Sequence, residues 1–467
     1  MDIPATRGIP TSAVEHSTIR KISIRIVPFV ALMFFINFLD RTAISFAAPN
    51  GLEQDLALTA AQFGFASGVF FIGYILLEVP SNLALHRFGA RLWLARIMVT
   101  WGIVSLLFTW VQNYPQLIGL RFLLGIAEAG FFPGAILFLS TWVPARHRGK
   151  MLAFFYLAQP LTSVIGSPLA GWLMTHDGAL GGLEGWRFMF LCVSIPAIIV
   201  GILCLVVLKD RPSQVKWLDA DEKTWLETTL ASENKHKVGG EGAKGGLRAA
   251  FGSGRVWMLS FVYFGFIYGL YALSFFLPTI IDGFQEQFGT TFDLFQKGLI
   301  TAIPYVPAAI ALYFWSRDAF RRGVKTWHIA VPALVGGVAV PFALFMQSPA
   351  ATIAVIAVVA MAIFAALPNF WTVPTQFLTG AAAAAGVALI NTLGNLAGFA
   401  APYITGAVAD ATGDYKVPMM IVGFFMVLSA VLMVLVARGR SADRPSGPDA
   451  DARTAEATTA TATEIGA

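Results

Sequence analysis

About twelve apolar segments, each near 20 residues long, follow one another along this 467-residue chain. An α-helix needs about 20 residues to cross the hydrocarbon core of a bilayer. Charged residues make up only 13% of the chain, against about 25% of a typical soluble domain. So few charges cannot cover a soluble surface of this size, and we expect lipid to cover much of the protein.

Irregular backbone at membrane depth is tolerated only against protein or a wet cavity, so the segments are expected to be helical. Prolines interrupt two of them, 297–316 and 351–376. We therefore predict an all-α membrane protein with twelve transmembrane helices. The predicted helices lie near 26–48, 63–85, 92–111, 115–140, 151–174, 187–208, 255–281, 297–316, 327–346, 351–376, 384–408 and 417–437.

A long polar stretch at 209–254 divides the segments into two groups of six. Its charged part could form a short surface helix, and its glycine-rich part is typical of a flexible linker. Short basic turns occupy the same place in each group, HRFGARLWLAR and SRDAFRRGVKTWH, which indicates a weak internal repeat. We predict two pseudo-symmetric six-helix bundles, 26–208 and 255–437. They are flanked by tails at 1–25 and 438–467, and the composition of the last favours disorder.

The connections between segments alternate in charge. The connection at 50–62 has no Lys or Arg, whereas the next one carries Arg87, Arg91 and Arg96. The net charge of +5 and the pI of about 9.2 therefore indicate membrane topology rather than nucleic-acid binding. The positive-inside rule places both termini in the cytoplasm and predicts a multi-pass protein of the cell's inner membrane.

Several classes of protein lack support in the sequence. The N-terminus has no apolar core with a small-residue cleavage site, so it is not a signal peptide. The two cysteines exclude a disulfide scaffold. The six histidines are scattered without the spacing of metal ligands. No Walker A motif, dinucleotide fingerprint or nucleophile elbow is present. We expect no metal and no cofactor, with protons as the coupling ion, and a monomer.

Two adjacent charges, Asp40 and Arg41, interrupt the first apolar segment. A charge at the centre of a bilayer costs roughly 2.5–3.5 kcal/mol on insertion scales. Leucine would anchor the helix better, so the pair indicates a polar pathway or a binding site inside the membrane domain. The structural alternative is a pair that only joins neighbouring helices.

A second pair of charges, Arg121 and Glu128, lies in the fourth segment. The two residues are seven apart, which places them on one helical face about 10 Å apart along the axis. A buried carboxyl group near an arginine can exchange a proton as its surroundings change. We therefore hypothesise that Asp40 and Glu128 load and release protons. Arg41 and Arg121 would hold an anionic substrate or pair with these carboxylates. The alternative for Arg121 and Glu128 is an ion pair that locks helices together.

Uncharged polar residues lie on other segments. Asn391 and Asn395 are four apart on one helical face, and Tyr74 and Glu78 repeat this spacing in the second segment. Gln159 precedes a proline in the fifth segment. We interpret Asn391, Asn395, Tyr74 and Gln159 as candidate substrate contacts. The alternative for the asparagines is hydrogen bonding between helices.

The chain resembles the anion:cation symporter family of the major facilitator superfamily. The resemblance extends from the first to the eleventh segment. The residues that carry it are NFLDRTAISFA, EVPSNLALHRFGAR, RFLLGIAEAGFFPG, STWVPARHRGK, VIGSPLAGW, DRPSQVKWLDADE and ALINTLGNLAGFAAPYITG. Bacterial permeases for tartrate, phthalate, hydroxyphenylacetate, nicotinate-type acids or sugar acids are the most similar branch.

The resemblance implies a proton-driven importer of the rocker-switch type. It implies proton coupling by Asp40 and Glu128, and it carries the two family arginines over to Arg41 and Arg121. It also implies substrate contacts by Asn391 and Tyr74. The turn with Arg87, Gly89 and Arg91 would form the cytoplasmic gate.

The sequence departs from the family pattern in two turns between helices. His86 stands where the superfamily usually has an aspartate, and Asp318 is displaced in the turn of the second half. The sequence therefore does not identify the charged residues that hold the corresponding turn of the second half in place.

We predict proton-coupled import of a small mono- or dicarboxylate by alternating access. One alternative is a proton-driven exporter of lipophilic compounds, which would have a more apolar cavity. Alternatives of another class are a membrane-embedded transferase and a non-transporting receptor. The first would need catalytic His or Asp clusters at a membrane edge, and the second a larger signalling domain than residues 209–254 provide.

Overall fold

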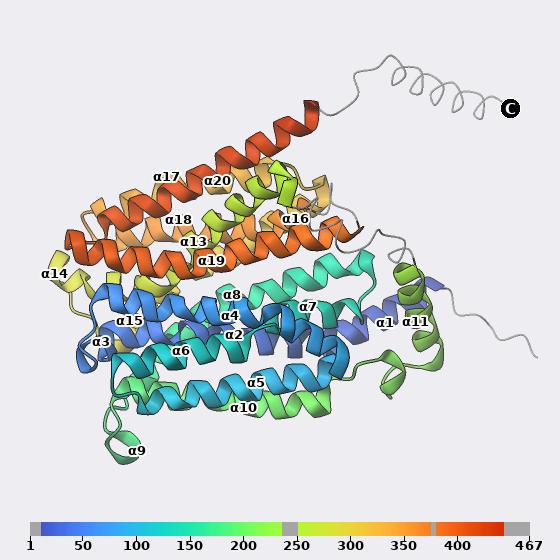
Figure 1. Ribbon diagram of the computed structural model, residues 1–467, viewed down its shortest axis with the longest axis horizontal. Coiled ribbons are helices and arrows are strands. Elements are labelled where there is room, and N and C mark those ends of the chain that lie inside the picture. The colour runs from blue at the N-terminus through green and yellow to red at the C-terminus, as the bar shows by residue number, and fades with distance from the viewer. Residues whose placement is uncertain (1–10, 236–250, 375–379, 443–467) are drawn as a thin grey trace, which may run out of the picture.

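The computed structural model describes residues 11–235, 251–374 and 380–442, and every regular element among them is a helix. The helices lie roughly along the long axis of the molecule (Figure 1). Helices of the N-terminal half, such as α5 and α10, occupy the lower part of this view, and α17, α18 and α20 of the C-terminal half occupy the upper part.

The N-terminal bundle begins with a helix outside the predicted spans. Its elements are α1 (Thr11–Arg25), α2 (Val27–Ala47), η1 (Ala48–Asn50), α3 (Leu52–Asp55), α4 (Ala60–Phe88), α5 (Ala90–Leu107), η2 (Phe108–Trp110), α6 (Tyr114–Glu128), α7 (Phe131–Ser140), α8 (Ala145–Met174), α9 (Ala179–Gly182) and α10 (Gly185–Val207). At one end lie α3 and α9, which we call the α3 face; α1 and the linker helix α11 define the opposite α11 face.

The linker region and the C-terminal bundle follow. Their elements are η3 (Pro212–Gln214), α11 (Ala220–Lys235), α13 (Gly254–Asp282), α14 (Phe284–Phe288), α15 (Leu294–Ala302), α16 (Tyr305–Arg322), α17 (Trp327–Ala339), η4 (Val340–Phe345), α18 (Pro349–Phe370), α19 (Gly380–Thr412) and α20 (Lys416–Ala442).

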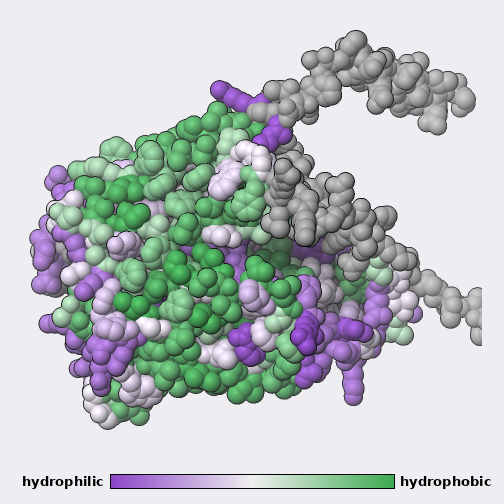
Figure 2. Space-filling model, in the orientation of Figure 1, coloured by the Kyte–Doolittle hydropathy of each residue, from purple (hydrophilic) through white to green (hydrophobic). Residues whose placement is uncertain are grey.

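The predicted membrane fold is confirmed in outline. Eleven helices in the described part of the chain are long and apolar enough to cross a membrane, and a shorter apolar helix, Trp327–Ala343, stands where the ninth span is predicted. Apolar side chains form a broad band over the face seen in Figure 2, while hydrophilic residues gather at its two ends. This distribution suits a protein surrounded by lipid between two wet surfaces.

The boundaries differ from the prediction at the C-terminal end. Helix α20 continues to Ala442, so residues 438–442 are helical rather than disordered. The rest of the predicted disordered tail, 443–467, and the glycine-rich linker, 236–250, lie outside the described residues. The charged part of the linker forms α11, as the sequence suggests.

Two predicted spans contain a break. In segment 115–140 the chain leaves the helix at Ala129 and turns at Gly130, whose φ of 83° favours glycine. A Cβ on Gly130 would also lie 2.5 Å from Ser81 Oγ of α4. In segment 297–316 the break falls before Tyr305, at Pro304, which has no N–H to continue the helix.

Close backbone packing joins the two bundles toward the α3 face. A Cβ on Gly68 of α4 would lie 2.7 Å from the carbonyl oxygen of Phe399 on α19. A Cβ on Gly298 of α15 would lie 2.5 Å from the carbonyl oxygen of Ser167 on α8. Small residues allow this approach in membrane bundles, so glycine fixes two tight seams between the bundles.

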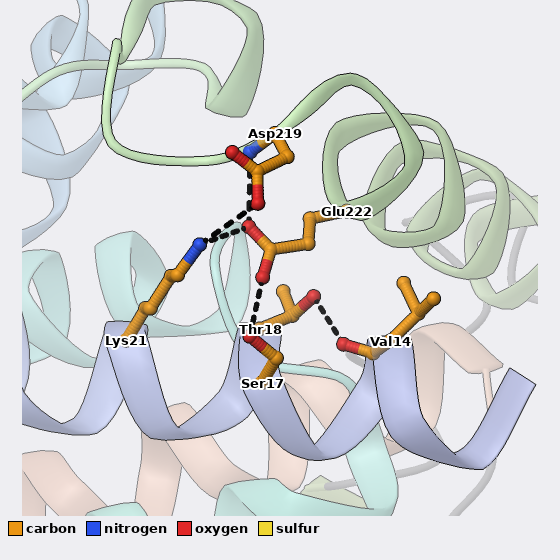
Figure 3. Close-up of polar contacts among 6 residues, drawn as sticks. All are labelled: Val14, Ser17, Thr18, Lys21, Asp219 and Glu222. Carbon is orange, nitrogen blue, oxygen red and sulfur yellow. Dashed lines mark hydrogen bonds and ion pairs between the residues drawn. The ribbon is translucent and has the colours of Figure 1, made fainter. Parts of the chain in front are cut away.

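At the α11 face the linker helix is attached to the N-terminal half. Lys21 Nζ of α1 lies 3.2 Å from Asp219 Oδ2 and 2.8 Å from Glu222 Oε2, and Ser17 Oγ donates to Glu222 Oε1 at 2.6 Å (Figure 3). Farther along α11, a carboxylate oxygen of Glu233 accepts from the backbone N–H of Ala145 at the start of α8, at 2.8 Å. These contacts dock α11 onto the N-terminal bundle.

Candidate functional site

A cavity lies between the two bundles, and aromatic and uncharged polar side chains form most of its wall. Residues of the N-terminal bundle that line it are Phe34, Asn37, Phe38, Arg41, Tyr74, Phe132, Tyr156 and Gln159. Those of the C-terminal bundle are Tyr263, Ile267, Leu270, Tyr271, Leu367, Trp371, Asn391, Gly394 and Asn395. Among the described residues of this wall, Arg41 is the one that carries a charge.

The guanidinium group of Arg41 is held by both bundles. Its Nη1 donates to the hydroxyl of Tyr271 at 2.8 Å, and its Nη2 forms an ion pair with Glu128. The ring of Phe70 lies 4.7 Å from the guanidinium carbon, within the range of a cation–π interaction. Arg41 Nε has no hydrogen-bond partner among the described residues. An arginine held in this way keeps one donor without a partner beside the cavity.

Asn37 lies one helical turn before Arg41 on α2 and lines the same cavity. Its side chain is 1% exposed, and neither its amide nitrogen nor its oxygen has a partner among the described residues. Buried polar groups without partners are uncommon, because leaving them unpaired costs about 1–3 kcal/mol. The sequence reasoning missed Asn37, although its spacing of four from Arg41 would have placed both on one helical face.

The side chain of Asp40 makes different contacts from that of its neighbour Arg41. Its carboxylate accepts from Trp101 Nε1 at 2.8 Å and from Ser105 Oγ at 3.3 Å, both on α5, and it is 1% exposed. It does not line the cavity. The structure therefore places Asp40 between two helices of one bundle, and its role in proton coupling stays a prediction.

Arg121 and Glu128 do not pair with each other. Arg121 donates from Nε to the carbonyl of Ala66 at 3.3 Å and from Nη2 to that of Ser67 at 3.1 Å, both on α4. It is 1% exposed and does not line the cavity. This placement favours a helix-joining role, and it gives the predicted substrate-binding role of Arg121 no support. Glu128 is fully buried behind Arg41, and its Oε2 has no partner among the described residues.

The two asparagines of α19 contact the opposite bundle. Asn391 Nδ2 donates to Glu78 Oε1 of α4 at 2.6 Å, and Asn395 Nδ2 donates to Glu78 Oε2 at 3.3 Å. Both asparagines line the cavity, as do Tyr74 and Gln159. The residues proposed from the sequence as substrate contacts therefore meet at one cavity, with the exception of Arg121.

The turn predicted to form a gate is tied to the end of its own bundle. Helix α4 ends before Gly89, and the backbone N–H of Arg91 donates to Asp210 Oδ1 at 2.9 Å. Arg91 Nε donates to the carbonyl of Leu205 on α10 at 2.6 Å, while Arg87 is exposed. An acid therefore does contact this turn, although it comes from beyond α10 and not from the position of His86. The gating role stays a prediction.

In the second half, Asp318 of α16 contacts two basic side chains. Its carboxylate lies 2.8 Å from Arg322 Nε on the same helix and 3.4 Å from the ring of His328 on α17. His328 is fully buried, and its Nδ1 accepts from the backbone N–H of Lys325 at 2.9 Å. The displaced aspartate thus joins α16 to α17 within its own bundle.

A carboxylate joins the bundles at the α3 face. Asp410 of α19 accepts from the backbone N–H groups of Ala60 and Ala61 at 3.0 and 2.8 Å. An anion at the N-terminus of α4 is stabilised by the unsatisfied N–H groups and the helix dipole. Glu53 lies nearby, outside the spans. Burial, and then the negative charges of Asp282 and Asp410, raise the pKa of Glu53 to about 7.

Comparison with known proteins decides the family. The family model described as the Major Facilitator Superfamily matches residues 30–402. This chain belongs to that superfamily. The superfamily membership expected from the resemblance is thereby confirmed, and the protein is a multi-pass membrane transporter rather than an enzyme.

Curated relatives cover nearly the full chain. A protein of Agrobacterium vitis, provisionally named as a tartrate transporter, is 43% identical and aligns over 92% of this chain and 94% of its own. NicT of Pseudomonas putida, provisionally named as a metabolite transport protein, is 38% identical over 91% and 96%. A quinolone resistance transporter of Acinetobacter baumannii is 36% identical over 90% and 95%.

The solved structures support the same fold. A bacterial homolog of the human lysosomal transporter Spinster, in an inward-facing and unoccupied conformation, aligns with a TM-score of 0.69. The alignment covers 92% of this chain and 98% of that one, at 19% sequence identity. The likeness confirms the predicted major facilitator fold, with its two six-helix bundles.

Proposed function

We propose that this transporter imports a small organic anion together with protons across the cytoplasmic membrane. The observation that carries the proposal is Arg41, the charged residue in the wall of the cavity, with a free Nε donor. A guanidinium group stays charged and binds carboxylates through paired donors. The name of the Agrobacterium vitis relative supports a hydroxy-dicarboxylate as the substrate class.

Neutral donors around Arg41 would complete the recognition of the anion. Asn37 lies on the same helix with both polar atoms unpaired, and Asn391 and Asn395 approach from α19. Amide groups can bind carboxylate oxygens and hydroxyl groups at once. The aromatic rings of the wall would pack against the carbon skeleton of the substrate and exclude water.

Proton coupling would use the carboxyl groups that contact Arg41 and α5. Glu128 pairs with Arg41 through one oxygen and leaves Oε2 unpaired, so a proton can be carried there. Protonation would weaken the hold of Glu128 on Arg41 and free the guanidinium for a substrate carboxylate. Asp40 would act separately, because its protonation changes the contact between α2 and α5 through Trp101.

The proposed direction of transport depends on symport with protons and on which face of the protein is cytoplasmic. We assign the α11 face to the cytoplasm, because the basic turn that contains Arg91 contacts Asp210, in the connection from α10 to α11. Protons then enter from the α3 face down their gradient.

The proposal is tested with purified protein in liposomes that carry an inward proton gradient. We expect labelled tartrate to accumulate, and a protonophore to reduce the internal level to that of passive equilibration. Protein-free liposomes are the control. Failure to take up any of a panel of hydroxy, aromatic and sugar acids would contradict the proposal.

One observation favours a second candidate function, the export of lipophilic compounds. A relative named as a quinolone resistance transporter is 36% identical to this chain, and the cavity wall is rich in aromatic side chains. In the same liposomes an exporter would move a quinolone in the direction opposite to the proton flow. Tartrate uptake with no quinolone flux in the wild type favours the importer.

A further inference from the structure

Glu78 of α4 is a buried carboxyl group to which neither the family comparison nor the proposed mechanism gives a role. Its side chain contacts the cavity residues Asn391 and Asn395 of the opposite bundle, at 2.6 and 3.3 Å. Both of its oxygens accept hydrogen bonds from these asparagines. Arg41 is the cation whose charge acts on it most directly. Tyr74 of α4 and Tyr263 of α13 line the same cavity as the two asparagines.

These contacts are the ones that a carboxylate substrate would need. An anion in the cavity meets Arg41 on one side and the amide groups of Asn391 and Asn395 on the other. In the described structure one N–H of each amide group already donates to Glu78. A substrate carboxylate that binds both amide groups in the same way would compete with Glu78 for these donors.

We propose that Glu78 is a built-in substitute for the substrate's carboxylate. It satisfies the two asparagines and links α4 to α19 when the cavity is empty, and the incoming anion displaces it. The inference rests on the proposed function, because it requires that an organic anion binds in this cavity. The inference assigns to Glu78 a role in setting the affinity of the cavity for the substrate anion.

The substitute has a consequence for the empty carrier. Net transport requires the unloaded protein to return between its two conformations, and buried donors without partners oppose that step. By bridging the bundles in place of the substrate, Glu78 keeps these donors paired. The empty protein can then complete its cycle, whereas a protein without the bridge depends on exchange of one anion for another.

Isothermal titration of the full-length protein in detergent with tartrate measures the competition. We expect Glu78→Gln to bind tartrate roughly tenfold more tightly than the wild type, the weight of one hydrogen bond to a charged group. Glu78→Asp, which keeps the charge but withdraws it by one methylene, should give a smaller gain. Glu53→Gln is the matched control, because it makes the same chemical change outside the cavity and should leave the affinity unchanged.

A double-mutant cycle separates competition from a general effect of charge. In the Asn391→Ala/Asn395→Ala background the amide donors are gone, so Glu78→Gln should give no further gain. A full tenfold gain in that background means that Glu78 acts by distant repulsion alone, and the proposal is wrong.

Two results overturn the inference in distinguishable ways. Equal affinity of the wild type and Glu78→Gln for tartrate refutes the substitute while leaving the proposed function intact. Absence of binding by both proteins, with tartrate and with the wider acid panel, refutes the proposed function and the inference with it. A gain in Glu78→Gln, accompanied by a fall in net uptake relative to tartrate exchange in liposomes, supports both.

Discussion

The two bundles of this transporter differ in where they keep charge. Asp40, Arg41, Glu78, Arg121 and Glu128 are all buried within the N-terminal bundle. In the described part of the C-terminal bundle, the buried polar residues are uncharged amides and hydroxyls, together with His328. Tyr263, Tyr271, Trp371 and the two asparagines form its side of the cavity.

Because of this difference, we expect the two bundles to have different roles in transport. Charges in one bundle can respond to protons, because their balance changes when a carboxyl group is neutralised. Neutral donors and rings in the other bundle keep the same properties across that change and can recognise the substrate in either state. The two sets meet at the cross-bundle bonds of Arg41 to Tyr271 and of Asn391 and Asn395 to Glu78.

The largest expected effect comes from breaking the buried ion pair. Arg41→Gln leaves the fully buried Glu128 without its cation, which should destabilise the protein by about 3–5 kcal/mol and abolish uptake. The double variant Arg41→Gln/Glu128→Gln should recover much of the stability but no transport. Thermal unfolding in detergent and tartrate uptake measure the two properties. Recovery of uptake in the double variant would show that the pair is structural.

Asp40→Asn tests whether charge in the N-terminal bundle couples transport to protons. The amide oxygen can still accept from Trp101 Nε1, so we expect a folded protein that loses gradient-driven accumulation and keeps exchange. The control is Asp55→Asn, because Asp55 accepts from Trp186 Nε1 at 2.5 Å in the same way at the α3 face. Normal accumulation in Asp40→Asn would remove this residue from the coupling mechanism.

Asn37 allows substrate recognition to be separated from stability. Because its side chain is buried without partners in the described structure, Asn37→Leu should leave the empty protein as stable as the wild type or more so. The same change should weaken tartrate binding roughly tenfold through the lost hydrogen bond. The thermal midpoint without ligand and the dissociation constant test this. Thr392→Ala, at an exposed position of α19, is the control. A large loss of stability with unchanged affinity would make Asn37 a structural residue.

The smallest expected effect concerns the acidic group at the α3 face. The native pKa of Glu53 is raised to about 7 from the ordinary value of 4.5. The folded protein therefore binds more protons than the unfolded chain between these values, and stability should fall as pH rises from about 5 to 7. Glu53→Gln should reduce this fall in the thermal midpoint. Identical pH profiles of the variant and the wild type would contradict the prediction.

The fold could be predicted from the sequence because the bilayer leaves few choices. A run of twenty apolar residues predicts a spanning helix whatever its neighbours are. The breaks before Phe131 and Tyr305 were harder to predict, because they depend on local contacts. Gly130 turns where α4 approaches closely, and a lone glycine or proline within an apolar segment does not reveal such an approach.

The site could be predicted only in part. Helical spacing shows which face of a helix a residue occupies, but not which helix packs against that face. Arg41, Asn391 and Asn395 lie on faces that meet at the cavity. Arg121 has the same apparent signal, yet its face contacts the carbonyl groups of α4. Asn37 is uncharged, so its place in an apolar segment is not unusual enough to indicate a site. Asn391, which donates to Glu78, lies more than 300 residues away from it in the chain.

The glycine seam between α4 and α19 has a kinetic consequence. Where Gly68 meets Phe399, the nearest atom is a backbone carbonyl oxygen, which cannot swing aside as a side chain does. Opening the α3 face must therefore separate whole helices, a motion of microseconds to milliseconds rather than the nanoseconds of a rotamer change. The rate of turnover would then be limited by the movement of whole helices and not by the ligand-binding side chains.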